Sequence, residues 1–155
     1  MNKYEIRFAL ANISNKIKLK LLQMYNNEEN IYNNINEILK SDMMSLKDKV
    51  KFKEHSYEDE MNFLKALNDN SIEIVKITEK HYPEKLRNID NPPYILFYKG
   101  NLSLAYDNMI AVVGSRKSSI YGLDVTKYLA REIYRVGYGV VSGVAYGIDT
   151  ALTTP

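Results

Sequence analysis

The pattern that most constrains the fold of this chain lies in residues 109–149, where short apolar runs alternate with glycine-containing loops. The run at residues 110–113 leads into a loop of sequence GSRKSS, and the run at residues 140–141 leads into SGVAYGID. Between the two runs, apolar residues repeat at helical spacing: Val125, Leu129, Ile133 and Val136. Gly137 stands where such a helix would end. The order strand, helix, strand predicts a βαβ unit with two parallel strands.

The first of these loops, residues 114–119, matches neither of the common nucleotide-binding loops. The dinucleotide fingerprint requires glycine where this chain has Arg116 and Ser119, and the P-loop requires a Gly-Lys-Ser/Thr triplet that the loop lacks. What remains is a glycine turn, backbone N–H groups at a helix N-terminus, hydroxyl groups and the cations of Arg116 and Lys117, a combination that suits an anion. The alternative is a plain turn in which Ser118 or Ser119 caps the helix.

The second loop favours the anion-binding interpretation. Ser142, Gly143 and Gly147 follow the second strand. Because the carboxyl ends of parallel strands share one edge of the sheet, and ligands of open α/β sheets bind there, the two loops are expected to form a phosphate site together. Asp149 either caps the next helix or orients a ligand, and the capping role is favoured.

Residues 1–46 predict a small all-α domain that precedes the α/β part. Apolar residues recur there at helical spacing in two stripes, Ile17, Leu21 and Tyr25, followed by Ile31, Ile35, Ile38 and Leu39. The charged segment 47–55 is expected to be a linker. The pair Ser56 and Asp59 resembles a capping box, so a further helix is expected to start at Ser56 and to open an α/β domain over residues 56–155.

Two more strands are expected ahead of the βαβ unit. Residues 72–77 alternate apolar and charged side chains, and residues 94–98 form an apolar run bounded by a proline pair and by Gly100. They are expected to extend the α/β part of the chain.

Composition excludes several classes of function. No stretch approaches the ~20 consecutive apolar residues of a membrane-spanning helix, the N-terminus does not look like a signal peptide, and the chain contains no cysteine. These features indicate a cytoplasmic protein. A net charge of +2 means that any nucleic-acid site must be a local basic patch. No catalytic carboxylate pair, Ser-His-Asp set, metal cluster or cofactor motif is visible in the sequence.

Four motifs stand in order within residues 72–149: Tyr-Pro-x-x-Leu, a proline pair before a short strand that ends in Gly-Asn, a Gly-Ser-Arg loop, and Ser-Gly-x-Ala-x-Gly-Ile-Asp. Together they resemble the DNA-processing protein A family (DprA, also called Smf). The N-terminal helices resemble more loosely the family's small domain of sterile-alpha-motif or helix-hairpin-helix type. The resemblance implies a partial Rossmann-like parallel sheet preceded by that helical domain.

In function, the resemblance implies a non-enzymatic protein that binds single-stranded DNA and loads the RecA recombinase during natural transformation. It implies contacts to the DNA backbone for Gly114, Ser115 and Arg116, to which Lys117 is added by proximity. Ser142, Gly143 and Gly147 match the family's second loop, which lines the same phosphate-binding pocket. Tyr146 stands where the family often has arginine, and this residue and Tyr121 are candidates for stacking on a base.

The family typically forms a homodimer and continues beyond Gly-Ile-Asp with further strands and helices, whereas this chain reads GIDTALTTP. We therefore expect a truncated copy without much of the dimer surface, with an open sheet edge and poor stability on its own. The alternative function is a nucleotide or nucleoside-phosphate hydrolase, or another phosphate-binding enzyme on a related sheet, in which Asp149 would be required.

Overall fold

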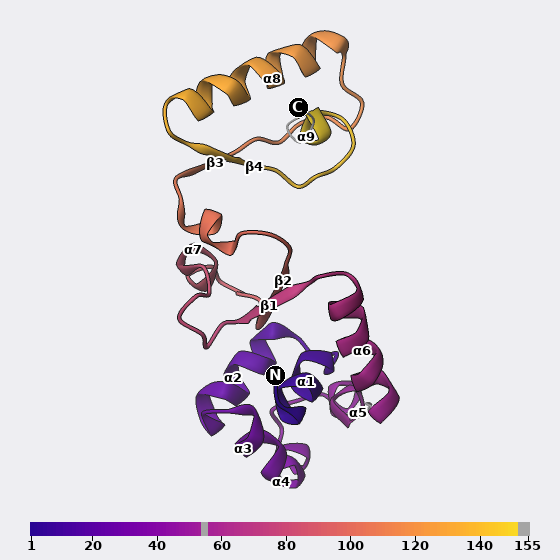
Figure 1. The fold of residues 1–155 in the computed structure, drawn as a ribbon. Coiled ribbons are helices and arrows are strands. Elements are labelled where there is room, and N and C mark those ends of the chain that lie inside the picture. The colour runs from indigo at the N-terminus through magenta and orange to yellow at the C-terminus, as the bar shows by residue number, and fades with distance from the viewer. Residues whose placement is uncertain (54–55, 152–155) are drawn as a thin grey trace. The chain divides into compact units, whose positions relative to one another are not determined.

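The computed structural model describes residues 1–53 and 56–151, which form two compact units, Met1–Gly100 and Asn101 onward (Figure 1). Each unit mixes helices with a small sheet, which confirms the α/β class. The end of the expected linker, residues 54–55, and the chain end, residues 152–155, lie outside the described residues. The domain limits expected at residues 46 and 56 stay a prediction, and packing divides the described residues after Gly100.

The first unit begins with a series of helices whose starts are set by side-chain caps. The amide oxygen of Asn2 accepts hydrogen bonds from the backbone of α1, while Ser14 and Asn27 cap α2 and α3. Ser56 and Asp59 form the expected capping box at the start of α6. The bounds are α1 Lys3–Leu10, α2 Asn15–Tyr25, α3 Glu28–Asn33, α4 Ile35–Lys40, α5 Leu46–Lys53 and α6 Tyr57–Asp69.

The core of the first unit contains the predicted apolar stripes. Leu21, Ile31 and Ile38 are fully buried, and the other stripe residues pack against them. Phe8 and Tyr94 meet edge to face, with ring centroids 4.9 Å apart. This packing holds together helices that are too short to persist alone.

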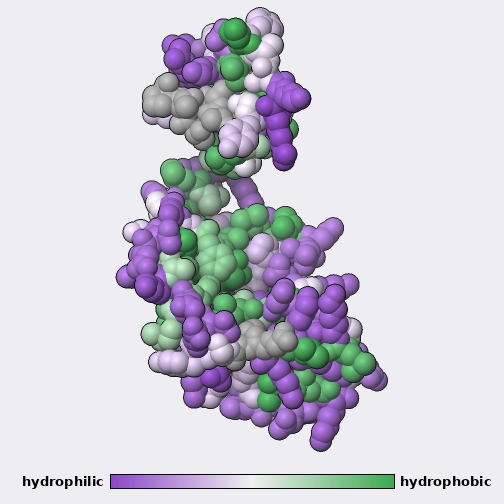
Figure 2. All heavy atoms as spheres, turned by 90° about the vertical axis from the view of Figure 1, so that its right-hand side faces the viewer, coloured by the Kyte–Doolittle hydropathy of each residue, from purple (hydrophilic) through white to green (hydrophobic). Residues whose placement is uncertain are grey.

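The charged segment expected to be a linker is helical over its described part. Phe52 of α5 is fully buried and stacks on Tyr32 with ring centroids 5.4 Å apart. One aromatic side chain among lysines is a weak signal in sequence, but its burial is enough to fold the segment onto the core. The other side of this region is exposed: Figure 2 shows apolar side chains among hydrophilic ones on the face where α5 and α6 lie.

A hairpin-like pair of strands completes the first unit. β1 (Glu73–Lys76) and β2 (Ile95–Tyr98) pair antiparallel, and the short helix α7 (Glu84–Arg87) lies between them in the chain. Both strands fall within the ranges expected from sequence. The Tyr82 hydroxyl donates to the Pro93 carbonyl at 2.8 Å, which fixes the connecting segment beside the proline pair.

The second unit is the predicted βαβ unit. β3 (Met109–Ala111) and β4 (Gly139–Val141) are parallel, with Ile110 opposite Val140. Helix α8 (Ile120–Arg135) connects them, the 3₁₀ helix η1 (Leu102–Tyr106) precedes β3, and α9 (Ile148–Ala151) follows β4.

Gly137 ends α8 as predicted. Its φ is +83°, its N–H donates to the Tyr134 carbonyl at 2.9 Å, and the Tyr138 N–H donates to the Ile133 carbonyl at 3.1 Å. This is the Schellman arrangement, which requires a left-handed residue after the helix. The turn brings the chain back to form β4 beside β3.

Candidate functional site

The two glycine-containing loops meet at the carboxyl ends of β3 and β4. The Ile148 N–H donates to the Ser115 carbonyl at 3.2 Å, so the loops are joined by a direct hydrogen bond. Gly147 has a φ of +92°, and a Cβ at this position would lie 2.3 Å from the Ser115 oxygen and 2.7 Å from the Arg116 oxygen. Only glycine allows this approach.

Gly114 makes a second close approach between the loops. A Cβ on Gly114 would lie 2.7 Å from side-chain carbons of Ile148. Each loop therefore contributes one glycine to the contact between them, Gly114 from the first loop and Gly147 from the second. Sequence reasoning assigned both glycines to the site but missed Ile148, whose N–H and side chain lie against the first loop. Its apolar side chain carried no signal for a polar site.

The hydroxyl groups of the first loop shape the backbone. Ser115 Oγ accepts from the Lys117 N–H at 3.1 Å and donates to the Lys117 carbonyl at 2.8 Å. Ser119 is the N-cap of α8 and accepts from the Gly122 N–H at 3.1 Å. The alternative interpretation of this loop expected Ser118 or Ser119 to cap the helix, and this is correct for Ser119.

The cations of the first loop remain available for a ligand. Arg116 and Lys117 are exposed, and neither side chain forms an ion pair with any residue that the structure describes. Arg116 offers a planar fork of N–H donors that matches two phosphate oxygens. The first loop therefore presents two positively charged side chains next to a backbone whose conformation is fixed by Ser115 and Ser119.

The second loop is held by its own polar groups and by Asp149. Ser142 Oγ accepts from the Val144 N–H at 3.2 Å. Val144 has a φ of +55°, an unfavourable conformation for a β-branched residue. Strain of this kind gathers at functional sites. The sequence did not reveal this residue, because strain depends on backbone geometry.

Asp149 is the second residue of α9 and is therefore not its N-cap, contrary to the favoured expectation. Its side chain is buried, and Oδ2 accepts from the Ala145 N–H at 3.4 Å. A Cβ on Gly143 would lie 3.2 Å from the same oxygen. The carboxylate on which a hydrolase would depend is thus engaged with the loop backbone. The aspartate lies two positions after the N-cap position, because α9 already begins at Ile148 and Gly147 precedes it.

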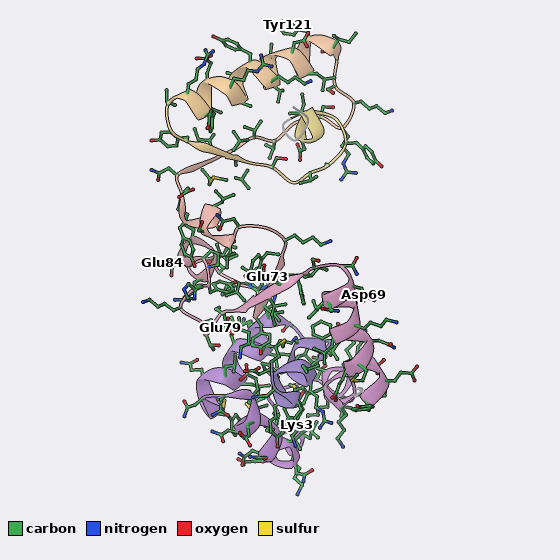
Figure 3. The ribbon with its side chains drawn as sticks, viewed as in Figure 1. Lys3, Asp69, Glu73, Glu79, Glu84 and Tyr121 are labelled. Atoms are coloured by element: carbon green, nitrogen blue, oxygen red, sulfur yellow. The ribbon has the colours of Figure 1, made fainter. Side chains whose placement is uncertain are left out.

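A hollow of about 510 Å³ opens beside the joined loops, lined by Arg116, Val144, Ala145 and Tyr146. Tyr146 is 86% exposed and lines the same hollow as Arg116. Tyr121, labelled in Figure 3, lies on α8 and does not line this hollow. The structure therefore brings together one predicted stacking residue and the principal cation, and places the other tyrosine on a separate surface.

Two broad classes of site find no support in the part of the chain that the structure describes. No helix there is long and apolar enough to cross a membrane. No group of three or more His, Asp or Glu residues within that part is arranged to hold a metal ion.

Comparison with known proteins defines the class. Residues 73–154 match the family profile described as DNA recombination-mediator protein A, a range that includes both loops. The chain is 40% identical over 87 residues to the DNA processing protein DprA of Bacillus subtilis, covering 56% of this chain and 29% of that protein. It is 34% identical over 85 residues to Protein Smf of Borreliella burgdorferi, covering 55% of this chain and 27% of that protein.

The fold supports the same class. The X-ray structure of DprA from Streptococcus pneumoniae matches 98% of this chain and 52% of that chain, with a TM-score of 0.67 and 28% identity. The chain belongs to the DNA recombination-mediator protein A family, as the four sequence motifs indicated. It spans less than a third of the length of the curated relatives it matches and about half of the solved chain.

Proposed function

We propose that the joined loops bind the phosphate backbone of single-stranded DNA and that the protein acts in DNA processing without catalysing a reaction. The observation that carries this proposal is the contact of the two loops through Gly147 and Ser115, because it places Arg116 and Tyr146 around one hollow. A cation for the phosphate and an aromatic ring for the base are the two elements that a single strand needs.

In this mechanism, Arg116 and Lys117 neutralise backbone phosphates, and the loop N–H groups orient them. Gly114, Ser115, Ser142, Gly143 and Gly147 shape the cradle by allowing close backbone approach or by fixing turns. None of these groups reads a base edge, so binding is expected to be independent of sequence. Tyr146 lines the hollow and is largely exposed, so its ring is proposed to stack on an unstacked base.

The family supports a proposal about partners as well. We infer that the DNA-bound protein loads the RecA recombinase during natural transformation in the cytoplasm and that the complete family architecture is a homodimer. This part of the proposal concerns the whole protein and rests on the likeness to DprA and Smf rather than on a contact within the chain.

The test is fluorescence anisotropy of a labelled oligothymidylate titrated with the 155-residue chain over a range of salt concentrations. Wild type should bind more weakly as salt rises, because bound phosphates release counterions. Arg116→Ala should weaken binding and reduce the salt slope by about 0.7, the value for one contact to a single strand.

Lys47→Ala is the matched control for this test, because Lys47 is an exposed cation of α5 in the other unit. This variant should bind like wild type. If Arg116→Ala and Lys47→Ala have the same affinity and the same salt slope, Arg116 does not contact the backbone and the proposed site is wrong.

A further inference from the structure

The second loop holds one residue in a strained conformation by hydrogen bonds on both sides of it. Val144 has a φ of +55°, which its β-branched side chain disfavours. The Val144 N–H donates to Ser142 Oγ at 3.2 Å, and the Ala145 N–H donates to Asp149 Oδ2 at 3.4 Å. A left-handed residue of this kind persists only where its surroundings fix it. Ser142 and Asp149 therefore supply the side-chain acceptors that hold Val144.

The two ends of the same loop are also linked. Ser142 Oγ donates to the Asp149 carbonyl at 3.5 Å, so residues seven positions apart in the chain meet there. A Cβ on Gly143 would lie 3.2 Å from Asp149 Oδ2, so this glycine leaves room for the carboxylate against the loop backbone. Gly143 thus has a role within the protein, because it admits the side chain that holds the loop.

The surroundings of Asp149 argue against direct contact with a phosphate. The residue is 6% exposed, and no cation in the described part of the chain forms an ion pair with it. A carboxylate without a cation partner repels a nearby phosphate. The hydrogen bond that its side chain makes runs to the loop backbone, so its effect on a ligand has to pass through the loop.

The loop that Asp149 holds contributes most of the lining of the hollow. Val144, Ala145 and Tyr146 line it together with Arg116 of the first loop. Tyr146 follows Val144 by two residues, so the backbone conformation at Val144 sets the course of the chain that carries the ring. If residue 144 relaxed to a negative φ, Tyr146 would move relative to Arg116.

We propose that Asp149 is a positioning residue of the candidate site: it accepts the Ala145 N–H, fixes Val144 in the left-handed conformation and thereby places Tyr146 at the same hollow as Arg116. This inference rests on the proposed DNA-binding function and gives Asp149 a role in it without a contact to DNA. It differs from the hydrolase alternative, in which the carboxylate itself would act on a phosphate.

The test extends the oligothymidylate anisotropy titration of the 155-residue chain to variants of Asp149. Asp149→Ala should weaken binding about tenfold, because the released loop populates the binding conformation for a smaller fraction of the time. Its salt slope should equal that of wild type, because no phosphate contact is lost. Asp149→Asn should restore most of the affinity, since the amide oxygen can still accept from Ala145. Asp124→Ala removes an exposed acid of α8 as the matched control and should bind like wild type.

Val144→Gly tests whether the effect passes through the strained residue, because glycine adopts a positive φ without strain. In the Val144→Gly background, Asp149→Ala should weaken binding about twofold or less, so that the two substitutions are non-additive. Circular dichroism checks that each variant keeps the helix content of wild type.

Several results would overturn the inference. If Asp149→Ala binds like Asp124→Ala, or loses as much affinity in the Val144→Gly background as in wild type, Asp149 does not position the loop. A reduced salt slope in Asp149→Ala, or no recovery in Asp149→Asn, would mean that the carboxylate charge acts directly and would also refute it. In each of these cases the loop site stands as long as Arg116→Ala weakens binding. If wild type does not bind, the proposed function fails and this inference fails with it.

Discussion

Replacement of Lys76 by methionine tests whether a buried charge cluster holds the first unit together. Lys76 Nζ lies 2.5 Å from Glu5 Oε1 and 3.5 Å from Glu28 Oε1, and the Tyr94 hydroxyl donates to the same Glu28 oxygen at 2.6 Å. Burial opposes the charge of Lys76, but the hydrogen bond to Glu5 and the charge of Glu28 outweigh it and raise its pKa above the ordinary value. The cluster links α1 and α3 to β1.

The expected loss of stability depends on which carboxylate is left without a partner when Lys76 is replaced. Glu5 is 19% exposed, so water replaces part of what Lys76 supplied, whereas Glu28 is 8% exposed and would keep an uncompensated charge. Breaking one side of a buried ion pair costs about 3–5 kcal/mol. Because Tyr94 still donates to Glu28, we expect about 3 kcal/mol, the low end of that range. This is a large share of the roughly 5–15 kcal/mol that stabilises a typical domain.

The assay is urea unfolding at pH 7 followed by circular dichroism, which reports mainly on the helices of the first unit. Lys80→Met is the matched control, because Lys80 is exposed and lies near Lys76 in the chain. Lys76→Met should lose about 3 kcal/mol, and adding Glu28→Gln should restore part of the loss by removing the uncompensated charge. If Lys76→Met and Lys80→Met unfold at the same urea concentration, the cluster does not stabilise the fold and this reasoning is refuted.

Two further predictions concern the loop contact and the pH dependence of stability. Gly147→Ala should abolish oligothymidylate binding in the anisotropy assay, because its Cβ would collide with the Ser115 carbonyl. Gly137 has a similar positive φ but no atom within 4 Å of a Cβ, so Gly137→Ala should cost only about 1 kcal/mol of stability. Equal binding by the two variants would contradict the loop geometry. Burial lowers the pKa of Lys18 to about 8 in the folded chain, whereas a lysine of the unfolded chain has a pKa of about 10.4. Between these two pH values the unfolded chain binds more protons, so the free energy of unfolding should rise with pH from 8 to 10. Urea midpoints across this range should show the rise in wild type and a flatter profile in Lys18→Met.

Capping and helix-termination rules predicted where helices begin and end at positions where the residue type favours one backbone conformation. The capping box at Ser56 begins α6, and Gly137 ends α8 with the positive φ expected of it. The same rules missed α5, because Phe52 is the one aromatic residue among its lysines. The burial of Phe52 depends on Phe8 and Tyr32, which come from other helices. They also placed Asp149 at a cap that α9 does not use.

The parallel βαβ unit, the family and the position of Gly114 and Gly147 in two loops at one sheet edge followed from sequence alone. Periodicity, glycine positions and motif order are properties of the chain itself. Tertiary structure alone decided the rest. The loop contact through Ile148, the strained Val144 and the hollow beside Tyr146 all depend on distances between segments about 30 residues apart in the chain. No local pattern encodes such distances, because they are set by how α8 returns the chain to the sheet.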